Sequence, residues 1–323
     1  MNKPRVVLAG GSGFLGRTLA GFLAGRDYEV IVLSRRPNPT DPLARQVKWD
    51  GRTLGDWVGH LDGAQVLVNL AGRSVDCRYT AVNRRAILDS RLQPTRALGE
   101  AIGQCASPPR VWLNSSTATI YKHSLDRPMD EAGEIGATHE AKDAFSVEVA
   151  RAWEGALNEA RTPCTRKLAL RTAMVFGAGE GGVFRVLRRL ARFGLGGAMA
   201  GGKQFVSWIH EEDFCRAIQW LIDRDDLSGP VNLAAPAPVP NRELMRLFRE
   251  ICGAPVGLPA SRWMLELGAF FLRTETELII KSRRVIPGRL LESGFQFQFA
   301  KLEEALRDLE LRVGGKRTGV KSE

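Results

Sequence analysis

The sequence predicts an α/β fold: a doubly wound parallel sheet followed by a smaller, mostly helical C-terminal domain. Three observations support this prediction. Apolar segments of strand length alternate with segments of helical periodicity through the first two thirds of the chain, which is typical of a parallel sheet covered by helices. A glycine-rich turn joins the first expected strand to the first expected helix, and the segments after residue 240 are expected to be helical.

The chain opens with a strand, a glycine turn and a helix. Val6–Ala9 form a short apolar run, as in a strand buried on both faces, and the chain turns helical from Arg17;. The glycines between them allow a tight bend, the close approach of backbone to a pyrophosphate, and close helix packing. Free N–H groups at the helix start would receive the phosphates. We therefore expect a dinucleotide-binding Rossmann domain, the alternative being a turn with no ligand. The contacts expected here are Gly10, Gly13, Phe14, Leu15 and Gly16.

The second expected strand, Tyr28–Leu33, indicates which nicotinamide cofactor is bound. It runs into Ser34, Arg35 and Arg36. An acidic side chain at this place would accept a hydrogen bond from the ribose 2′-hydroxyl of NAD, whereas an arginine accommodates a 2′-phosphate. With two arginines and no acid, the sequence predicts NADP(H). The alternative is that Arg35 and Arg36 are solvated loop charges.

Two further strands are expected to deliver cofactor contacts at the same edge. Gln46–Trp49 leads to Asp50, the expected contact for the adenine amino group. Gln65–Leu70 leads to two small residues that let the phosphate and ribose lie against the backbone. The cofactor contacts expected at the end of the strand Gln65–Leu70 are Leu70, Ala71 and Gly72.

The fifth expected strand, Arg110–Leu113, runs into a hydroxyl-rich turn. The turn spans residues 114–121 and follows a long helical pattern, Val82–Gly103. Because ligands bind outside the carboxyl ends of parallel strands, we expect Ser115 to contact the cofactor and Thr117 to belong to the site.

Three segments together resemble the extended short-chain dehydrogenase/reductase superfamily, which includes nucleotide-sugar epimerases and dehydratases. They are G-G-S-G-F-L-G at 10–16, N-L-A-G at 69–72 and S-S-T-A-T-I-Y at 115–121. Segments at 205–213, 232–241 and 284–295 resemble an atypical epimerase-family branch with its own C-terminal domain. The resemblance covers about residues 4–310. It implies an NADP(H)-dependent oxidoreductase or epimerase whose substrate is small, hydroxylated and in some cases phosphorylated or nucleotide-linked.

The superfamily's chemistry uses a Ser or Thr together with a Tyr-x-x-x-Lys pair, and the resemblance shows a departure here. Thr117 takes the Ser/Thr position, but Phe145 and Val149 stand where the Tyr and Lys belong, ahead of a helix expected from Ala150. Phe145 has no hydroxyl and Val149 has no amine. The usual proton-transfer pair is therefore absent.

Other side chains are candidates for the missing proton transfer. Tyr121 and Lys122 are adjacent and point apart on a strand end, and Glu148 faces either a cleft or solvent. His210 follows a strand-like run, and it is either a site residue near the nicotinamide or a structural histidine before the helix that starts near Asp213. The candidate catalytic residues are Thr117, His210 and Tyr121.

The later part of the chain supplies the substrate domain in this interpretation. A sixth strand, Lys167–Phe176, carries Arg171 near the site, and helix Val183–Phe193 presents four arginines on one face, which bind a diphosphate or are solvated;. Asn241 is expected to cap the helix Arg242–Cys252;. Further helices are expected at Trp263–Leu272, Thr276–Arg283 and Leu302–Leu309. The expected NADP(H)-binding domain comprises residues 1–175, with 208–235 returning to it. The expected substrate domain comprises residues 176–207 and 236–312, and the substrate site is expected between the two domains. Residues 313–323 are expected to form a disordered tail.

Composition, charge and cysteine content further limit the possible functions. The chain has 323 residues, 44% hydrophobic, with a net charge of +10. Because no nucleic-acid-binding module accompanies the charge, it favours either a soluble protein with a basic surface or a site for polyanionic small molecules. Five cysteines without C-x-x-C spacing predict reduced thiols and a cytoplasmic location;. We expect a small-molecule substrate and no nucleic-acid, membrane or metal partner, and leave the oligomeric state open.

Three hypotheses follow from these observations. The first is an NADP(H)-dependent oxidoreductase or epimerase with an unusual acid/base group. The second is a catalytically silent NADP(H)-binding sensor or partner protein. The third is a binder of nucleic acid or anionic membrane, for which charge is the sole support.

Overall fold

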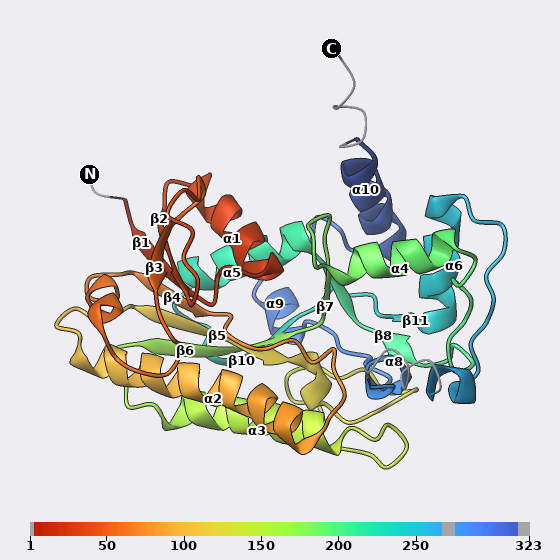
Figure 1. Ribbon diagram of the computed structural model, residues 1–323, viewed down its shortest axis with the longest axis horizontal. Coiled ribbons are helices and arrows are strands. Elements are labelled where there is room, and N and C mark those ends of the chain that lie inside the picture. The colour runs from red at the N-terminus through yellow and green to blue at the C-terminus, as the bar shows by residue number, and fades with distance from the viewer. Residues whose placement is uncertain (1–2, 267–274, 316–323) are drawn as a thin grey trace. The chain divides into compact units, whose positions relative to one another are not determined.

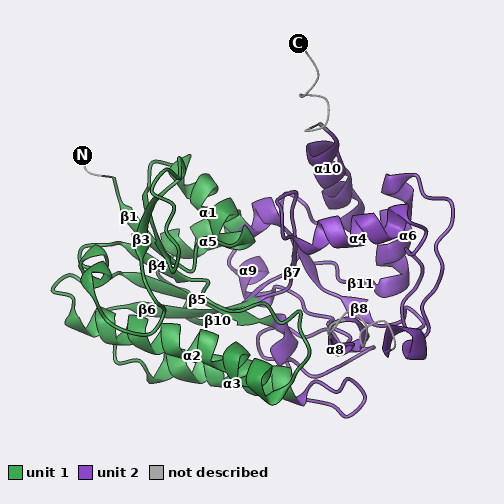
Figure 2. Cartoon of the chain, viewed as in Figure 1, with its two compact units in different colours: residues 1–117, 145–171, 215–231 green, residues 118–144, 172–214, 232–323 purple. Residues whose placement is uncertain are grey.

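The computed structural model describes residues 3–266 and 275–315. The chain divides into two compact units, coloured separately in Figure 2. The first unit comprises residues 1–117, 145–171 and 215–231, and the second comprises 118–144, 172–214 and 232–323. Each unit is therefore assembled from segments distant in sequence.

The first unit is built on a seven-stranded sheet with the order β10-β6-β5-β4-β1-β2-β3 (Figure 1). β1 pairs in parallel with both β2 and β4, and β2–β3 and β4–β5 are also parallel. The chain runs outward from β1 through β2 and β3, and then on the other side of β1 through β4, β5, β6 and β10. This is the doubly wound arrangement, which confirms the predicted fold class. The strands are β1 (Arg5–Ala9), β2 (Glu29–Ser34), β3 (Arg45–Lys48), β4 (Val66–Asn69), β5 (Val111–Thr117), β6 (Arg166–Thr172) and β10 (Gly229–Leu233).

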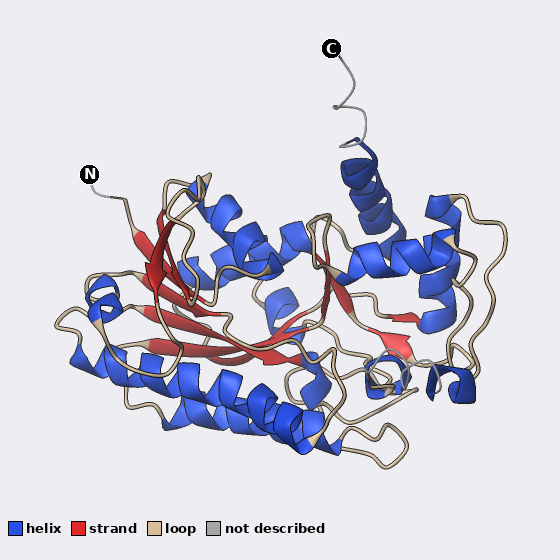
Figure 3. Ribbon diagram, in the orientation of Figure 1, coloured by secondary structure: helices blue, strands red, loops and turns tan. Residues whose placement is uncertain are grey.

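Helices cover both faces of this sheet. In Figure 3, α1 (Phe14–Ala24) and α5 (Glu211–Asp223) lie on one side, and α2 (Ala81–Gln104) and α3 (Ala144–Glu159) lie on the other. Central strands such as β1 and β4 are apolar at successive positions and buried on both faces, as expected between two helical layers. A short 3₁₀ helix, Asp56–His60, adds Trp57 to the core.

Three sequence predictions about these elements need correction. β5 continues to Thr117, so residues 114–117 are strand and not part of the expected turn. α3 begins at Ala144, not at Ala150, so Phe145 and Val149 lie inside the helix. The predicted strand Lys167–Phe176 is two strands. β6 ends at Thr172, the Ala173 N–H donates to the Leu233 carbonyl, and β7 (Met174–Phe176) pairs elsewhere. An uninterrupted apolar run carries no signal for such a break.

The second unit contains short strands and a helical core. β7 pairs in parallel with β9 (Trp208–His210), and β8 (Phe205–Val206) pairs antiparallel with β11 (Val239–Pro240). Its core gathers aromatic side chains that include Phe176, Trp208 and Phe248. A short 3₁₀ helix spans Ala118–Ile120. The helices are α4 (Val183–Arg192), α6 (Asn241–Cys252), α8 (Glu277–Ile280), α9 (Gly288–Glu292) and α10 (Leu302–Gly315).

Helix limits in the second unit differ from prediction at α6, at α8 and at α10, which continues past the expected end at Leu309 to Gly315. Asn241 is the first residue of α6 and its Oδ1 accepts from the Met199 N–H at 2.8 Å, so it is not the cap, which is Pro240. The expected helix Thr276–Arg283 is reduced to the four residues of α8. Residues 262–266 are helical, and the rest of the expected helix Trp263–Leu272 lies outside the described residues, as does most of the expected tail.

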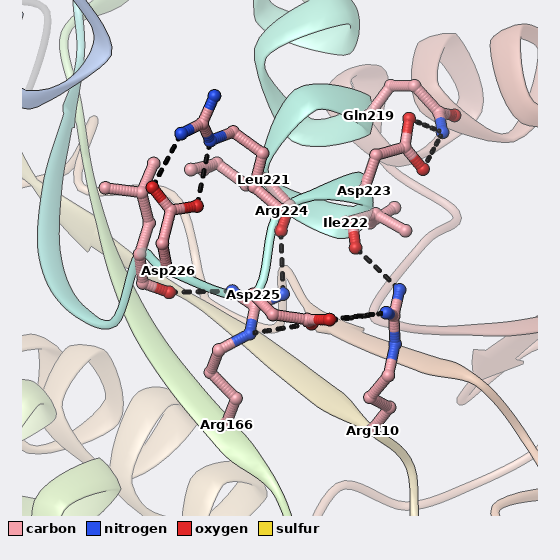
Figure 4. A network of polar contacts seen from close by, with 10 residues as sticks. Arg110, Arg166, Gln219, Leu221, Ile222, Asp223, Arg224, Asp225 and Asp226 are labelled. Atoms are coloured by element: carbon pink, nitrogen blue, oxygen red, sulfur yellow. Dashed lines mark hydrogen bonds and ion pairs between the residues drawn. The ribbon is translucent and has the colours of Figure 1, made fainter. Parts of the chain in front are cut away.

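A cluster of arginines fixes the edge of the sheet where β5 and β6 begin (Figure 4). Arg110 donates to the Ile222 carbonyl at 2.8 Å, and Arg166 donates to the carbonyls of Leu221 and Leu227 at 2.9 and 2.8 Å. Asp225 lies beside both guanidinium groups, 3.2 Å from Arg110 and 3.8 Å from Arg166. These contacts satisfy carbonyls at and beyond the end of α5. They lie at the opposite edge from the predicted site.

Across residues 3–266 and 275–315, no helix has both the length and the apolar character needed to cross a bilayer.

Candidate functional site

Three glycines of the first turn have different structural roles. Gly10 has φ of +72°, and a Cβ there would lie 2.7 Å from the Ala71 Cα. A Cβ at Gly16 would lie 2.3 Å from Gly11, so helix and turn can approach only without a side chain. A Cβ at Gly13 would meet nothing within 4 Å. The fold thus requires Gly10 and Gly16, whereas Gly13 faces open space.

The start of α1 next to Gly13 has the properties of an anion-binding helix end. Gly13 is the N-cap, it provides no side-chain cap, and the first turn of α1 contains no acidic residue. The first amide N–H groups of a helix have no partner within it, and the helix dipole favours negative charge there. Phe14 and Leu15, at the first two helical positions, are partly buried.

The end of β2 presents two arginines beside this turn. The Gly10 N–H donates to the Leu33 carbonyl at 3.0 Å, so the glycine turn and the end of β2 are joined. Ser34 is buried and its hydroxyl accepts from the Arg36 N–H at 3.2 Å. The side chains of Arg35 and Arg36 are exposed, and neither forms an ion pair or side-chain hydrogen bond with the part of the chain that the structure describes.

Asp50 follows β3, and its side chain forms hydrogen bonds within its own loop. Its carboxylate accepts from the N–H groups of Arg52 and Thr53 at 2.8 and 2.9 Å, and from the Thr53 hydroxyl at 2.7 Å. These bonds, chiefly those from Thr53, hold the pKa of Asp50 below its usual value. Asp50 is exposed, and its contact with an adenine stays a prediction.

A buried polar network supports the next two strand ends. Asn69 donates to the Asn114 Oδ1 at 2.7 Å and to the Thr95 hydroxyl at 3.2 Å, while its own Oδ1 accepts from the Ala71 N–H at 3.0 Å. The Trp153 indole N–H also donates to Thr95, at 3.1 Å. The network ties β4 and β5 to α2 and α3, and it sets the course of Leu70, Ala71 and Gly72. Asparagines at the ends of apolar strands were the sequence signal for it.

The end of β5 is held by a buried ion pair that the sequence did not reveal. Arg171 forms two hydrogen bonds with Glu154, at 2.9 and 2.8 Å, and its side chain is 5% exposed. Glu154 accepts in turn from the Ser116 hydroxyl at 2.6 Å. Ser115 and Thr117 flank Ser116 and are partly exposed. Arg171 therefore positions this strand end through Glu154.

The positions of the missing Tyr and Lys lie in an apolar cluster. Phe145 and Val149 are buried on the same face of α3 and pack with Ile87 of α2. Glu148, which lies between them in sequence, is exposed. This placement favours the solvent-facing alternative for Glu148.

The remaining catalytic candidates have structural partners in the second unit. Tyr121 is 2% exposed and its hydroxyl donates to the Asn232 Oδ1 at 2.8 Å. Lys122 pairs with Glu134 at 2.7 Å on the surface. Tyr121 is thus part of the packing of its own unit.

His210 is buried, with both ring nitrogens engaged. Its Nδ1 accepts from the Glu212 N–H at 3.1 Å, its Nε2 lies 3.2 Å from Asp308, and its ring stacks on Phe299 at 3.9 Å. The accepting Nδ1 places the proton on Nε2, directed at Asp308. Burial lowers the pKa of His210 to about 4. These contacts favour the structural alternative for His210.

The arginines of α4 have internal partners. Arg188 and Arg192 both pair with Glu310 of α10, the latter at 3.1 Å. Arg185 donates to the Ala178 carbonyl at 2.9 Å, and Arg189 lies over the Phe193 ring. Arg188 and Arg192 therefore join α4 to α10, a role that neither alternative in the sequence analysis contained.

Comparisons with known proteins agree with this geometry. A model of the NAD dependent epimerase/dehydratase family matches residues 6–234, and a domain of unknown function, DUF1731, matches residues 260–309. The epimerase family protein SDR39U1 of Bos taurus is 31% identical over 311 residues, covering 94% of this chain and 99% of that protein.

Two solved structures are similar. Human SDR39U1 (isoform 2), solved with NADPH, is 28% identical with a TM-score of 0.83, covering 95% of this chain and 99% of that one. A nucleoside-diphosphate sugar epimerase from Corynebacterium glutamicum is 26% identical with a TM-score of 0.74, covering 99% of this chain and 62% of that one. The chain therefore belongs to the NAD dependent epimerase/dehydratase family.

Proposed function

We propose that this chain binds NADP(H) and acts as an oxidoreductase or epimerase on a small hydroxylated substrate, with nucleotide-linked sugars as the first class to test. The first unit holds the cofactor in this proposal, and the segments 176–207 and 236–312 contact the substrate. When bound, NADP(H) supplies a nicotinamide ring that exchanges a hydride with a substrate carbon.

The observation that carries the proposal is the pair Arg35 and Arg36 at the end of β2. Both are exposed, and neither is paired with any described residue. Planar guanidinium groups suit a phosphate, and the 2′-phosphate of NADP(H) is recognised at the end of this strand in dinucleotide folds.

The rest of the turn fits the same ligand. Gly13 faces open space where a pyrophosphate would approach the uncapped start of α1;. Gly72 and Ser115 lie at the ends of β4 and β5, which the Asn69–Asn114 bond holds together. Human SDR39U1, solved with NADPH, supports the choice of cofactor, and the C. glutamicum epimerase supports the substrate class.

A second candidate is a catalytically silent NADP(H)-binding protein. Phe145 and Val149 are buried in an apolar cluster, so the places of the usual acid/base groups contain hydrocarbon. A sensor or partner protein would need the cofactor site alone. Turnover of any substrate that depends on Thr117 would rule this candidate out.

The test is a titration of purified protein with NADPH and with NADH, followed by tryptophan fluorescence. Arg36→Ala should weaken NADPH binding about tenfold or more, because a charge-assisted bond to phosphate contributes about 1.5–3 kcal/mol, and should leave NADH unchanged. Arg85→Ala, which removes an exposed arginine paired with Asp89 on α2, is the matched control. Equal affinity of wild type for both nucleotides, or no binding, would overturn the proposal.

A further inference from the structure

The place of the missing Tyr-x-x-x-Lys pair is covered by two polar side chains from outside α3. Phe145, Val149 and Trp153 follow one another at four-residue spacing, so they share one face of the helix;. The Tyr79 ring packs edge-on against Phe145, with centroids 5.0 Å apart. The Arg91 guanidinium lies over Trp153, 5.1 Å from the ring centroid. A phenol therefore packs on Phe145, the position of the missing Tyr, and a cation lies over Trp153, one turn beyond Val149, the position of the missing Lys.

Tyr79 is held by the start of α2. It is the last residue but one of the irregular segment 70–80 that follows β4, and it immediately precedes Thr80, the N-cap of α2. The Arg84 Nε donates to the Tyr79 carbonyl at 3.1 Å, and the same guanidinium lies over the Phe145 ring at 4.9 Å. Arg84 therefore links the backbone of Tyr79 to the Phe145 ring.

Arg91 is a half-buried cation whose described hydrogen-bond partners are all neutral. It donates to the carbonyls of Ile87 and Arg73 at 3.0 and 3.1 Å and approaches the Ser90 hydroxyl. Burial lowers the pKa of Arg91 to about 10, and the nearby Tyr79 opposes that change. Arg91 thus stays charged at neutral pH, and Tyr79 is the ionisable group whose negative form it would stabilise.

The pair lies at the predicted cofactor edge. A Cβ at Gly72 would meet the Arg91 guanidinium carbon at 3.5 Å, so Arg91 lies directly beside a backbone expected to contact the cofactor. Other ionisable groups also lie near Tyr79: Arg84 contacts its carbonyl, Arg78 precedes it in the chain, and Cys77 packs against the same apolar cluster.

We propose that Tyr79 and Arg91 take over the roles of the missing pair, Tyr79 exchanging a proton with the substrate and Arg91 holding the phenolate charge. The inference rests on the proposed function. In the oxidative direction the substrate O–H bond breaks, the Tyr79 O–H bond forms, and the substrate carbon passes its hydride to NADP⁺. The Tyr79 hydroxyl oxygen is enclosed, so a substrate meets it through a shift of the segment 70–80.

Ultraviolet titration at 295 nm tests the pair without any substrate. The chain has three tyrosines, so the component that disappears in Tyr79→Phe is assigned to Tyr79, and Tyr28→Phe provides the matched control. Enclosure alone raises a phenol's pKa, whereas an adjacent cation lowers it. We expect the midpoint of Tyr79 at least one pH unit below that of Tyr28, which is a tenfold larger phenolate fraction at a given pH. Arg91→Gln should raise the Tyr79 midpoint by one pH unit or more, whereas Arg91→Lys should leave it close to the wild-type value.

A wild-type Tyr79 midpoint at or above that of Tyr28, or a Tyr79 midpoint that does not move in Arg91→Gln, would overturn the inference. If Arg91→Gln does not fold, the wild-type comparison of Tyr79 with Tyr28 decides the test. NADPH titration separates the two proposals. Loss of NADPH binding in wild type refutes the function, whereas normal NADPH binding with an unshifted Tyr79 refutes the acid/base assignment alone. With any substrate found, Tyr79→Phe should lower kcat about 100-fold or more with NADPH affinity unchanged.

Discussion

Replacing Gly13 with alanine should separate cofactor binding from folding. Gly13 has φ of −79° and ψ of 179°, an extended conformation that any residue adopts, and the added methyl group would meet no protein atom within 4 Å. It would instead occupy the space in front of the first amide groups of α1. The folded protein tolerates the change, and a bound pyrophosphate does not.

The expected changes in stability and in NADPH affinity follow from the surroundings of residue 13 in the free protein and in the complex. An alanine is a weaker N-cap than glycine, but it also restricts the unfolded chain, and each effect is about 0.5–1 kcal/mol. They oppose one another, so the free energy of unfolding should change by less than about 1 kcal/mol. Losing one charge-assisted bond between a backbone N–H and phosphate costs about 1.5–3 kcal/mol, or roughly a 10- to 100-fold weaker affinity for NADPH.

The assay pairs a thermal melt with the fluorescence titration, and Gly16→Ala serves as the contrasting variant. A Cβ at Gly16 would lie 2.3 Å from Gly11 backbone atoms, so that variant should lose stability by at least the 1–3 kcal/mol typical of overpacking. Wild-type NADPH affinity in Gly13→Ala would refute the assignment of this turn to the pyrophosphate. A large loss of stability in Gly13→Ala would refute the geometric argument.

Two further predictions concern buried groups away from the turn. His210 has a pKa lowered to about 4 from 6.5, so the unfolded chain binds its proton more readily and stability should fall by about 2 kcal/mol between pH 7 and pH 5. His210→Gln should show a smaller fall in melting temperature over that range, and an identical fall would contradict the assignment. Arg166→Gln should lower the free energy of unfolding by about 2–3 kcal/mol, because the carbonyls of Leu221 and Leu227 lose their donor;. Denaturant unfolding measures this, and Asp225→Asn should cost about 1 kcal/mol or less because that carboxylate is exposed;.

The sheet was predictable because its information is local. Strands such as Val6–Ala9 are apolar on both faces and are followed at once by glycine or by a helical period. The start of α3 was missed because the charged residues of the preceding loop, together with the exposed Glu148, obscure the helical spacing of Phe145 and Val149 in the sequence. The break after β6 depends on the Leu233 carbonyl, far away in sequence.

The residues of the candidate site also differ in whether local sequence information predicts them. Gly10, Gly16, Arg35 and Arg36 follow directly from their position after a strand. The Glu154–Arg171 pair and the Tyr79–Phe145 contact join residues 17 and 66 positions apart. Neither has a fixed spacing that a sequence pattern would show. His210 was a candidate catalytic residue because it follows a strand-like run. Asp308 and Phe299, which explain its burial, come from the far end of the chain.

The residues of α3 support the candidate site through their packing. Phe145 and Val149 face α2, and Phe145 provides an apolar surface against which Tyr79 packs. One turn further on, Trp153 supports Arg91 and donates to Thr95, and Glu154 holds Ser116 at the end of β5. Each of these contacts positions a residue at the carboxyl edge of the sheet. In the proposal above, α3 is a support for the site, and the polar groups come from Tyr79, between β4 and α2, and from Arg91 of α2.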